Sequence, residues 1–158
     1  MAVEAVPKGY HTITPYMTVR DAARAIEFYK QAFGAVEKGV SKAPDGKIMH
    51  AELRIGDSII MLADEFPQFG SLSPQSTGGT GMGLHIYIED VDSAFDRAVK
   101  AGAKVEMPVS DMFWGDRYGK LADPFGHKWS IATHKADLTM EEMEQGMKAM
   151  MKDMPKSA

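Results

Sequence analysis

The chain has 158 residues, of which 44% are hydrophobic and 25% are charged, and these proportions are those of a globular protein rather than a disordered or fibrous one. It contains no cysteine, which excludes disulfide bonds, zinc ribbons and thiolate nucleophiles. The net charge of −4 without a basic cluster argues against nucleic acid as a partner, and no apolar run reaches the roughly 18 to 20 residues of a membrane span.

The first half of the chain predicts a strand, a helix and three further strands. The alternating apolar run ITPYMTV predicts the first strand, and DAARAIEFYKQAFG carries apolar residues at helical spacing. Asp21 is a candidate N-cap of this helix, and Gly34 suits the left-handed position that ends it. The runs AVEKGVS, KIMHAELRI and SIIMLA then predict three strands, with a turn at Gly56 and Asp57.

The second half of the chain repeats this order of elements. Residues 13–62 correspond to residues 82–131, a displacement of 69 positions. In the second copy GLHIYI predicts the first strand, and Asp90 and Gly102 bound the helix. Each copy therefore has the order β-α-β-β-β. The sheet of a single copy would leave its concave face exposed to solvent. We therefore expect the two copies to pair.

The repeat predicts how the chain is organised. We expect a single α+β domain over residues 1–158, in which two βαβββ modules form curved mixed sheets around a cavity. The modules span about 13–63 and about 83–134, and a segment rich in Pro, Ser and Gly at 64–82 links them as a surface connection.

The segment at about 138–154 predicts an additional, amphipathic helix. Thr139 and Glu142 form a capping box, and methionines follow at steps of three and four residues from Met140 to Met154. Methionine side chains adapt readily to a contact surface. The helix therefore either caps its own domain or packs across a dimer, and we expect a homodimer.

Several of these motifs are similar to one known family. The repeated βαβββ unit, the helix entry TVRDAARAIEFYKQAFGA and the hairpin DPFGHKWSIA resemble the vicinal oxygen chelate superfamily, which includes glyoxalase I, extradiol dioxygenases and bleomycin-resistance proteins. Within it, ITPYMTV, HAELRIGDSIIML, FWGDR and DPFGHKW are most similar to the PhnB-like branch. The resemblance covers about residues 8–134 and implies a fold, whereas the reactions of this superfamily differ widely.

The resemblance also implies where a metal would bind. The metal-dependent members use four His, Glu or Gln side chains, and the matching positions here are Thr14, Met61, Gly83 and Ser130. These four residues are poor ligands for the divalent ions that imidazole and carboxylate groups bind. We therefore expect no metal and no other cofactor, which argues against a mechanism of the glyoxalase I type.

Strand alternation leaves a second possibility for a metal. Alternate side chains share one face of a strand, so Tyr16, His50, Glu52 and His85 should all face the cavity. His50, Glu52 and His85 could form a shifted metal cluster. The other interpretation, which we favour, is that each of them forms local hydrogen bonds or contacts a ligand.

The connection between the last strands carries two further candidates. In DMFWGDR, Trp114 offers a flat surface for a ring-bearing ligand, and Arg117 could clamp a carboxylate or phosphate. Alternatively, Asp116 and Arg117 pair with each other while Trp114 closes one end of the barrel or a dimer contact. Trp129 should face the helix layer.

The sequence thus predicts a protein that binds a small organic ligand, or an enzyme that works without the usual metal. The predicted ligand-binding residues are Tyr16, His50, Glu52, His85, Trp114 and Arg117. The alternatives are a metal-dependent lyase or isomerase that uses the shifted cluster, and a structural or regulatory dimer. The start of the chain, MAVEAVPKGYHT, lacks the basic and apolar regions of a signal peptide, so we expect a cytoplasmic protein.

Overall fold

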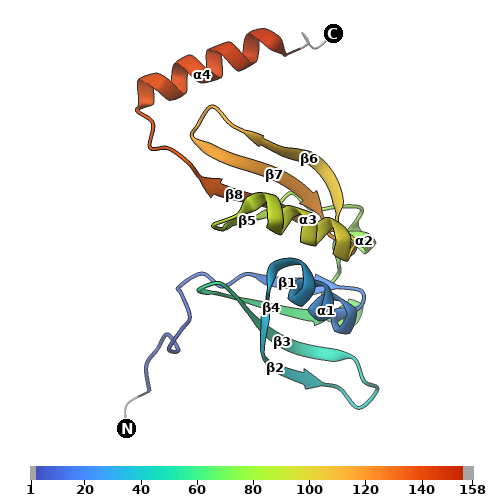
Figure 1. Ribbon diagram of the computed structural model, residues 1–158. Coiled ribbons are helices and arrows are strands. Elements are labelled where there is room, and N and C mark those ends of the chain that lie inside the picture. Colours follow the sequence, from blue (N-terminus) through green and yellow to red (C-terminus); the bar gives the residue numbers. More distant parts are fainter. Residues whose placement is uncertain (1–2, 155–158) are drawn as a thin grey trace.

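The computed structural model describes residues 3–154 and contains two βαβββ modules (Figure 1). Module 1 consists of β1 (Tyr16–Val19), α1 (Ala22–Phe33), β2 (Val36–Lys42), β3 (Ile48–Ile55) and β4 (Ser58–Asp64). Module 2 consists of β5 (Gly83–Tyr87), α3 (Val91–Ala101), β6 (Lys104–Asp111), β7 (Asp116–Ala122) and β8 (Lys128–His134). The expected α+β fold with two mixed sheets is confirmed.

The two sheets have the same topology. Their strand orders are β1-β4-β3-β2 and β5-β8-β7-β6, with the first pair parallel and the other pairs antiparallel. The register is also equivalent, because Tyr16 pairs with Met61 in module 1 and His85 pairs with Ser130 in module 2. Strands β1 and β5 lie at sheet edges.

Local capping explains where the two main helices begin and end. The side chains of Asp21 and Asp90 accept hydrogen bonds from the backbone N–H groups of Arg24 and Ser93, as expected of N-caps. Gly34 ends α1 at a φ of 66°, a left-handed conformation that favours glycine.

The first strand begins later than the sequence predicts. The run ITPYMTV predicts a strand from Ile13, whereas β1 starts at Tyr16 and Thr14 lies before it. Pro15 has no N–H to give to a ladder, although its carbonyl accepts a hydrogen bond from the Met61 N–H. The proline therefore marks the beginning of the regular strand.

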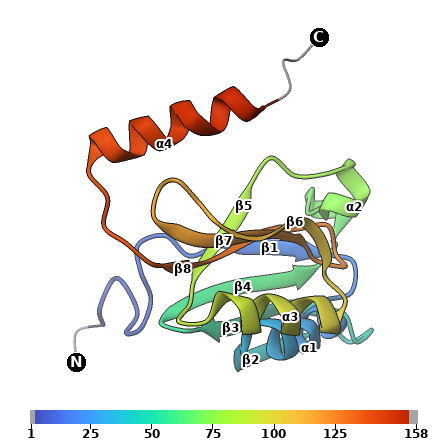
Figure 2. The ribbon, with the colours of Figure 1, turned by 45° about the horizontal axis from the view of Figure 1, so that its top comes forward.

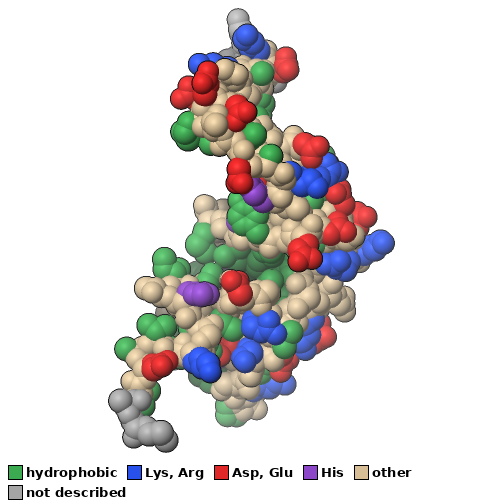
Figure 3. Space-filling view, turned by 60° about the vertical axis from the view of Figure 1, so that its left-hand side comes forward, with side chains coloured by type: hydrophobic (Ala, Val, Ile, Leu, Met, Phe, Trp, Pro, Cys, Tyr) green, Lys and Arg blue, Asp and Glu red, His purple; other side chains and the backbone are tan. Residues whose placement is uncertain are grey.

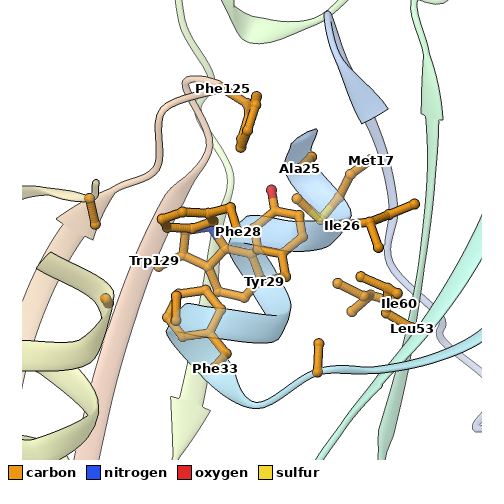
Figure 4. Close-up of a cluster of buried hydrophobic side chains, with 14 of the residues drawn as sticks. Met17, Ala25, Ile26, Phe28, Tyr29, Phe33, Leu53, Ile60, Phe125 and Trp129 are labelled. Carbon is orange, nitrogen blue, oxygen red and sulfur yellow. The ribbon is translucent and has the colours of Figure 1, made fainter. Parts of the chain in front are cut away.

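Both modules share one hydrophobic core. Helices α1 and α3 lie side by side (Figures 1 and 2), and the rings of Phe33 from α1 and Trp129 from β8 are 4.6 Å apart (Figure 4). Trp129 is 3% exposed and faces the helix layer, as the sequence predicts. Asp123 joins the modules further, because its carboxylate accepts hydrogen bonds from the Tyr29 hydroxyl at 2.7 Å and the Trp129 indole at 2.8 Å.

The connecting and terminal segments contain further short elements. The link between the modules contains a 3₁₀ turn, η1 (Pro67–Phe69), and a short helix, α2 (Pro74–Thr77). The predicted C-terminal helix is α4 (Met140–Asp153), and both hydrogen bonds of its capping box are present. Within residues 3–154, no helix is long and apolar enough to cross a membrane.

Candidate functional site

The inner face of the module 1 sheet carries a row of hydrogen-bonded polar side chains. Tyr16 comes from β1, and His50 and Glu52 come from β3, where strand alternation places them on one face while Ala51 and Leu53 are fully buried on the other. The structure therefore brings together three of the residues predicted to bind a ligand.

The contacts within this row form a continuous path. The Tyr16 hydroxyl lies 3.2 Å from His50 Nδ1, and His50 Nε2 lies 3.1 Å from Glu52 Oε1. A proton on Nε2 lets His50 donate to Glu52 and leaves Nδ1 to accept from the Tyr16 hydroxyl. The Tyr10 hydroxyl donates to the second oxygen of Glu52. The hydrogen bonds from Tyr10 and His50 lower the pKa of Glu52, which stabilises its ionised form.

The inner face of module 2 carries aromatic rings around a histidine. The His85 ring is 4.6 Å from the ring of Tyr87 and 5.9 Å from that of Tyr118. Trp114 packs edge-on against Tyr118 at 5.3 Å, so His85 and Trp114 contact the same tyrosine. Partial burial lowers the pKa of His85, an effect that the charge of Asp116 partly offsets. The neutral imidazole is therefore favoured, and its Nδ1 lies 2.7 Å from the Ser130 hydroxyl.

Asp116 holds the side chains of this face together, whereas the sequence predicts it only as a partner of Arg117. Its buried carboxylate accepts hydrogen bonds from the Trp114 indole at 3.0 Å, the Tyr87 hydroxyl at 3.2 Å and His134 Nδ1 at 2.8 Å. Burial opposes its ionisation, but the hydrogen bonds from His134, Trp114 and Tyr87 lower its pKa overall. Ser130 and His134 are four residues apart on β8, so strand alternation places them on the same inner face. This pattern could have predicted His134 as a residue of the site.

Arg117 is not placed to bind a ligand on the inner face. It alternates with Asp116 along β7 and therefore lies on the side of α3, where its guanidinium contacts Asp92 at 2.7 and 2.8 Å and Asp111 at 3.2 Å. These carboxylates raise the pKa of Arg117 and satisfy its charge. Arg117 is thus paired with Asp92 and Asp111 and not with Asp116, the partner that the alternative interpretation predicts, and its role in ligand binding stays a prediction.

The polar residues do not assemble a metal site. In the described part of the chain, no group of three or more His, Cys, Asp or Glu side chains could hold a metal ion. His50 and Glu52 lie on one sheet and His85 lies on the other, where its partner is Ser130. The positions Thr14, Met61, Gly83 and Ser130 also offer no strong donor set for a divalent ion. The residues present therefore do not fit the metal that the fold family implies.

A cavity lies at the junction of the two modules. Its volume is about 590 Å³, within the range of small-molecule sites. Apolar side chains from both modules line most of it, including Phe33, Ile60, Leu84, Ile86 and Trp129. His85 and Tyr87 also line it, so the cavity adjoins the aromatic inner face of module 2. Figure 3 shows hydrophobic side chains gathered in the hollow between the modules.

Comparisons with known proteins agree with this architecture. An uncharacterised protein of Mycobacterium bovis is 45% identical over 150 residues, which are 93% of this chain and 96% of the relative. The crystal structure of an Arabidopsis thaliana gene product is 28% identical with a TM-score of 0.63, covering 78% of this chain and 98% of that chain. A PhnB protein from Bacillus cereus, 19% identical, has the same fold with a TM-score of 0.61, over 78% of this chain and 99% of that chain.

The sequence pattern of one family spans most of both modules, from residue 10 to residue 131. This match confirms the resemblance that the repeated βαβββ unit indicates. The chain belongs to the Glyoxalase/Bleomycin resistance protein/Dioxygenase superfamily.

Proposed function

We propose that the protein binds a small, partly aromatic organic molecule without a metal ion. The observation that carries this proposal is the position of His85, which lines the apolar cavity and also belongs to the aromatic inner face of module 2. An apolar part of the ligand fits the cavity, and a polar group can accept or donate a hydrogen bond at His85. Because Arg117 is occupied by Asp92 and Asp111, an uncharged aromatic ligand is favoured over an anionic one.

Titration with the uncharged fluorescent probe N-phenyl-1-naphthylamine tests this proposal. His85→Ala should raise the Kd of the probe about tenfold, because it removes a contact of roughly 0.5–1.5 kcal/mol in the cavity. Trp114→Ala should raise the Kd less, because Trp114 does not line the cavity and supports His85 only through the ring of Tyr118. Arg117→Gln is the matched control and should leave the Kd unchanged. No binding, or equal effects of all three variants, would contradict the proposal. Native mass spectrometry of the purified protein would identify a co-purified natural ligand.

Metal content separates this proposal from its alternative, a metal-dependent lyase or isomerase. The four family positions lack suitable donors, and His50 and Glu52 lie on a different sheet from His85. The protein should therefore carry well under one transition-metal ion per chain after dialysis, measured by inductively coupled plasma mass spectrometry. Stoichiometric zinc, nickel, manganese or iron would favour the metal-dependent enzyme.

The proposal covers two possible roles: the protein either sequesters the ligand or converts it without a metal ion. For conversion, the row from Tyr16 through His50 to Glu52 would move a proton only to or from a ligand that extends beyond the cavity, because none of these three residues lines it. In the described residues this row makes no hydrogen bond to the group around His85. We also infer a homodimer, because aromatic side chains on the inner faces of both modules are exposed, Tyr16 by 52% and Tyr87 by 64%.

A further inference from the structure

A second cavity adjoins the apolar cavity described above. Its volume is about 390 Å³, and its walls come from the segment before β1 and from the inner face of module 1. His11 and Thr14 line both cavities, so the two cavities share a border. A molecule held in the apolar cavity can therefore extend past this border into the second one.

The second cavity contains a single carboxylate. Among its described lining residues, Glu52 is the only acidic side chain, and none is a lysine or an arginine. Val6, Pro7 and Met61 supply apolar surface beside it. The cavity thus combines one site of negative charge with walls that suit hydrocarbon.

The Glu52 carboxylate is ionised and can accept further hydrogen bonds. Hydrogen bonds from Tyr10 and His50 lower its pKa, and the charge of Lys38 adds the smallest part of this effect. A carboxylate has about four lone-pair positions, and the two donors use one at each oxygen. In the described chain no lysine or arginine lies within 4.0 Å of it, and its side chain is 25% exposed. A ligand with a positive charge would therefore meet an acceptor that no such side chain neutralises.

These features favour an organic cation over a metal ion. A metal ion needs several donors, and in residues 3–154 no group of three His, Cys, Asp or Glu side chains could supply them. A primary ammonium group needs only hydrogen-bond acceptors for its three N–H groups, and its carbon chain can lie against apolar walls. One carboxylate in a partly apolar cavity meets these needs.

We propose that the ligand carries a protonated amino group, which binds the Glu52 carboxylate in the second cavity while the aromatic part occupies the apolar cavity. The inference rests on the proposed function, because it adds a charged group to the ligand proposed there. The aromatic part itself stays uncharged. The ligand class is therefore a hydrophobic amine, in which a chain that passes His11 and Thr14 joins the ring system to the ammonium group.

A pair of fluorescent probes tests the charge. Dansylcadaverine joins a naphthalene ring system through a five-carbon chain to a primary ammonium group, and N-acetyl-dansylcadaverine has the same ring and chain without the charge. The wild-type protein should bind dansylcadaverine at least about tenfold more tightly, because only this probe forms a charge-assisted hydrogen bond with Glu52. Equal Kd values for the two probes would overturn the inference.

Two matched variants test the residue. Glu52→Gln should remove the difference between the probes and leave the Kd of the acetylated probe unchanged. Glu27→Gln removes the same charge from an exposed position of α1 that lines neither cavity, and should keep the preference for the amine. A preference that persists in Glu52→Gln, or that falls equally in both variants, would show that the net negative charge of the chain attracts the amine. Either result would overturn the inference.

NMR of the methionine methyl groups tests the location. Met61 lines the second cavity, and it pairs with Glu52 across strands β4 and β3. Its signal, assigned with Met61→Leu, should shift when dansylcadaverine binds to the wild-type protein. An unshifted Met61 signal at saturation would place the amine elsewhere and overturn the inference.

The inference and the proposed function can fail separately. If N-phenyl-1-naphthylamine and the acetylated probe bind as tightly as dansylcadaverine, the proposed function stands and the amine site is wrong. If none of the three probes binds, both are wrong.

Discussion

Asp116 is 4% exposed and accepts hydrogen bonds from side chains of β5, β8 and the loop before β7. Burying a carboxylate lowers the stability of the fold unless hydrogen-bond donors satisfy it. Moving a donor away would leave the Asp116 carboxylate unpaired at a cost in free energy, and this cost keeps the donors in place. His134 then extends this group to the segment before α4, because its Nε2 lies 3.0 Å from Asp137. One residue thereby links the aromatic inner face to the start of the C-terminal segment.

Protonation of His134 should make the free energy of unfolding depend on pH. Hydrogen bonds with Asp116 and Asp137 raise its pKa, so protonation is favoured in the folded state. This contribution to the free energy of unfolding should be fully present below the unfolded pKa of about 6.5 and lost as the pH rises through the folded value. An NMR titration of the His134 ring should show the raised pKa, and His134→Gln should remove this part of the pH dependence. A titration at or below 6.5 would contradict the assignment.

At the scale of the elements, glycine allows α3 to pack closely on its sheet. Gly119 in β7 lies opposite Phe95, and a Cβ at this position would be 2.6 Å from Phe95 Cε2 and 3.1 Å from Val109 Cγ2. Gly39 in β2 offers the contrast, since a Cβ there would meet nothing within 4 Å. Gly119 in module 2 is therefore required for close packing, whereas Gly39 in module 1 is not.

Alanine at these two positions should have different effects. Gly119→Ala should lower the free energy of unfolding by about 1–3 kcal/mol, because the added methyl overpacks the contact between α3 and the sheet. Gly39→Ala should leave it unchanged or raise it slightly. Chemical denaturation of both variants measures the difference. Similar values for the two would show that Phe95 and Val109 move aside without cost.

At the scale of the whole molecule, the core joins the modules. Phe33 and Trp129 come from different modules and are 7% and 3% exposed, and Tyr29 reaches Asp123 across the same boundary. Neither module therefore buries its own helix face completely without the other. The modules should behave as one cooperative unit.

Phe33→Ala should test this coupling. Removing a buried ring should lower the free energy of unfolding by about 3–5 kcal/mol, since it leaves a cavity between the modules. Both modules should still unfold in a single transition, with Trp fluorescence and far-UV circular dichroism coinciding. Two separated transitions would show that each module is stable alone.

The order of the helices and strands and their duplication could be predicted from the sequence, because helix caps, turns and the alternation of apolar residues act over a few residues. The exception is the start of β1, which Pro15 shifts to Tyr16. Asp21, Gly34 and the capping box of Thr139 and Glu142 occupy the predicted positions. Alternation also placed Tyr16, His50 and Glu52 correctly on one inner face. These features need no knowledge of distant contacts.

Which polar side chains already have hydrogen-bond or ion-pair partners depends on how the modules pack. Arg117 contacts Asp92, 25 residues away in sequence, on the opposite side of the sheet from its predicted ligand. The packing of the modules also decides that His50 and Glu52 lie apart from His85, and that Asp116 holds Trp114. Pairings of this kind depend on how helices and sheets pack across long sequence separations, and the free energy of satisfying a charge is gained only when that packing brings its partner within reach.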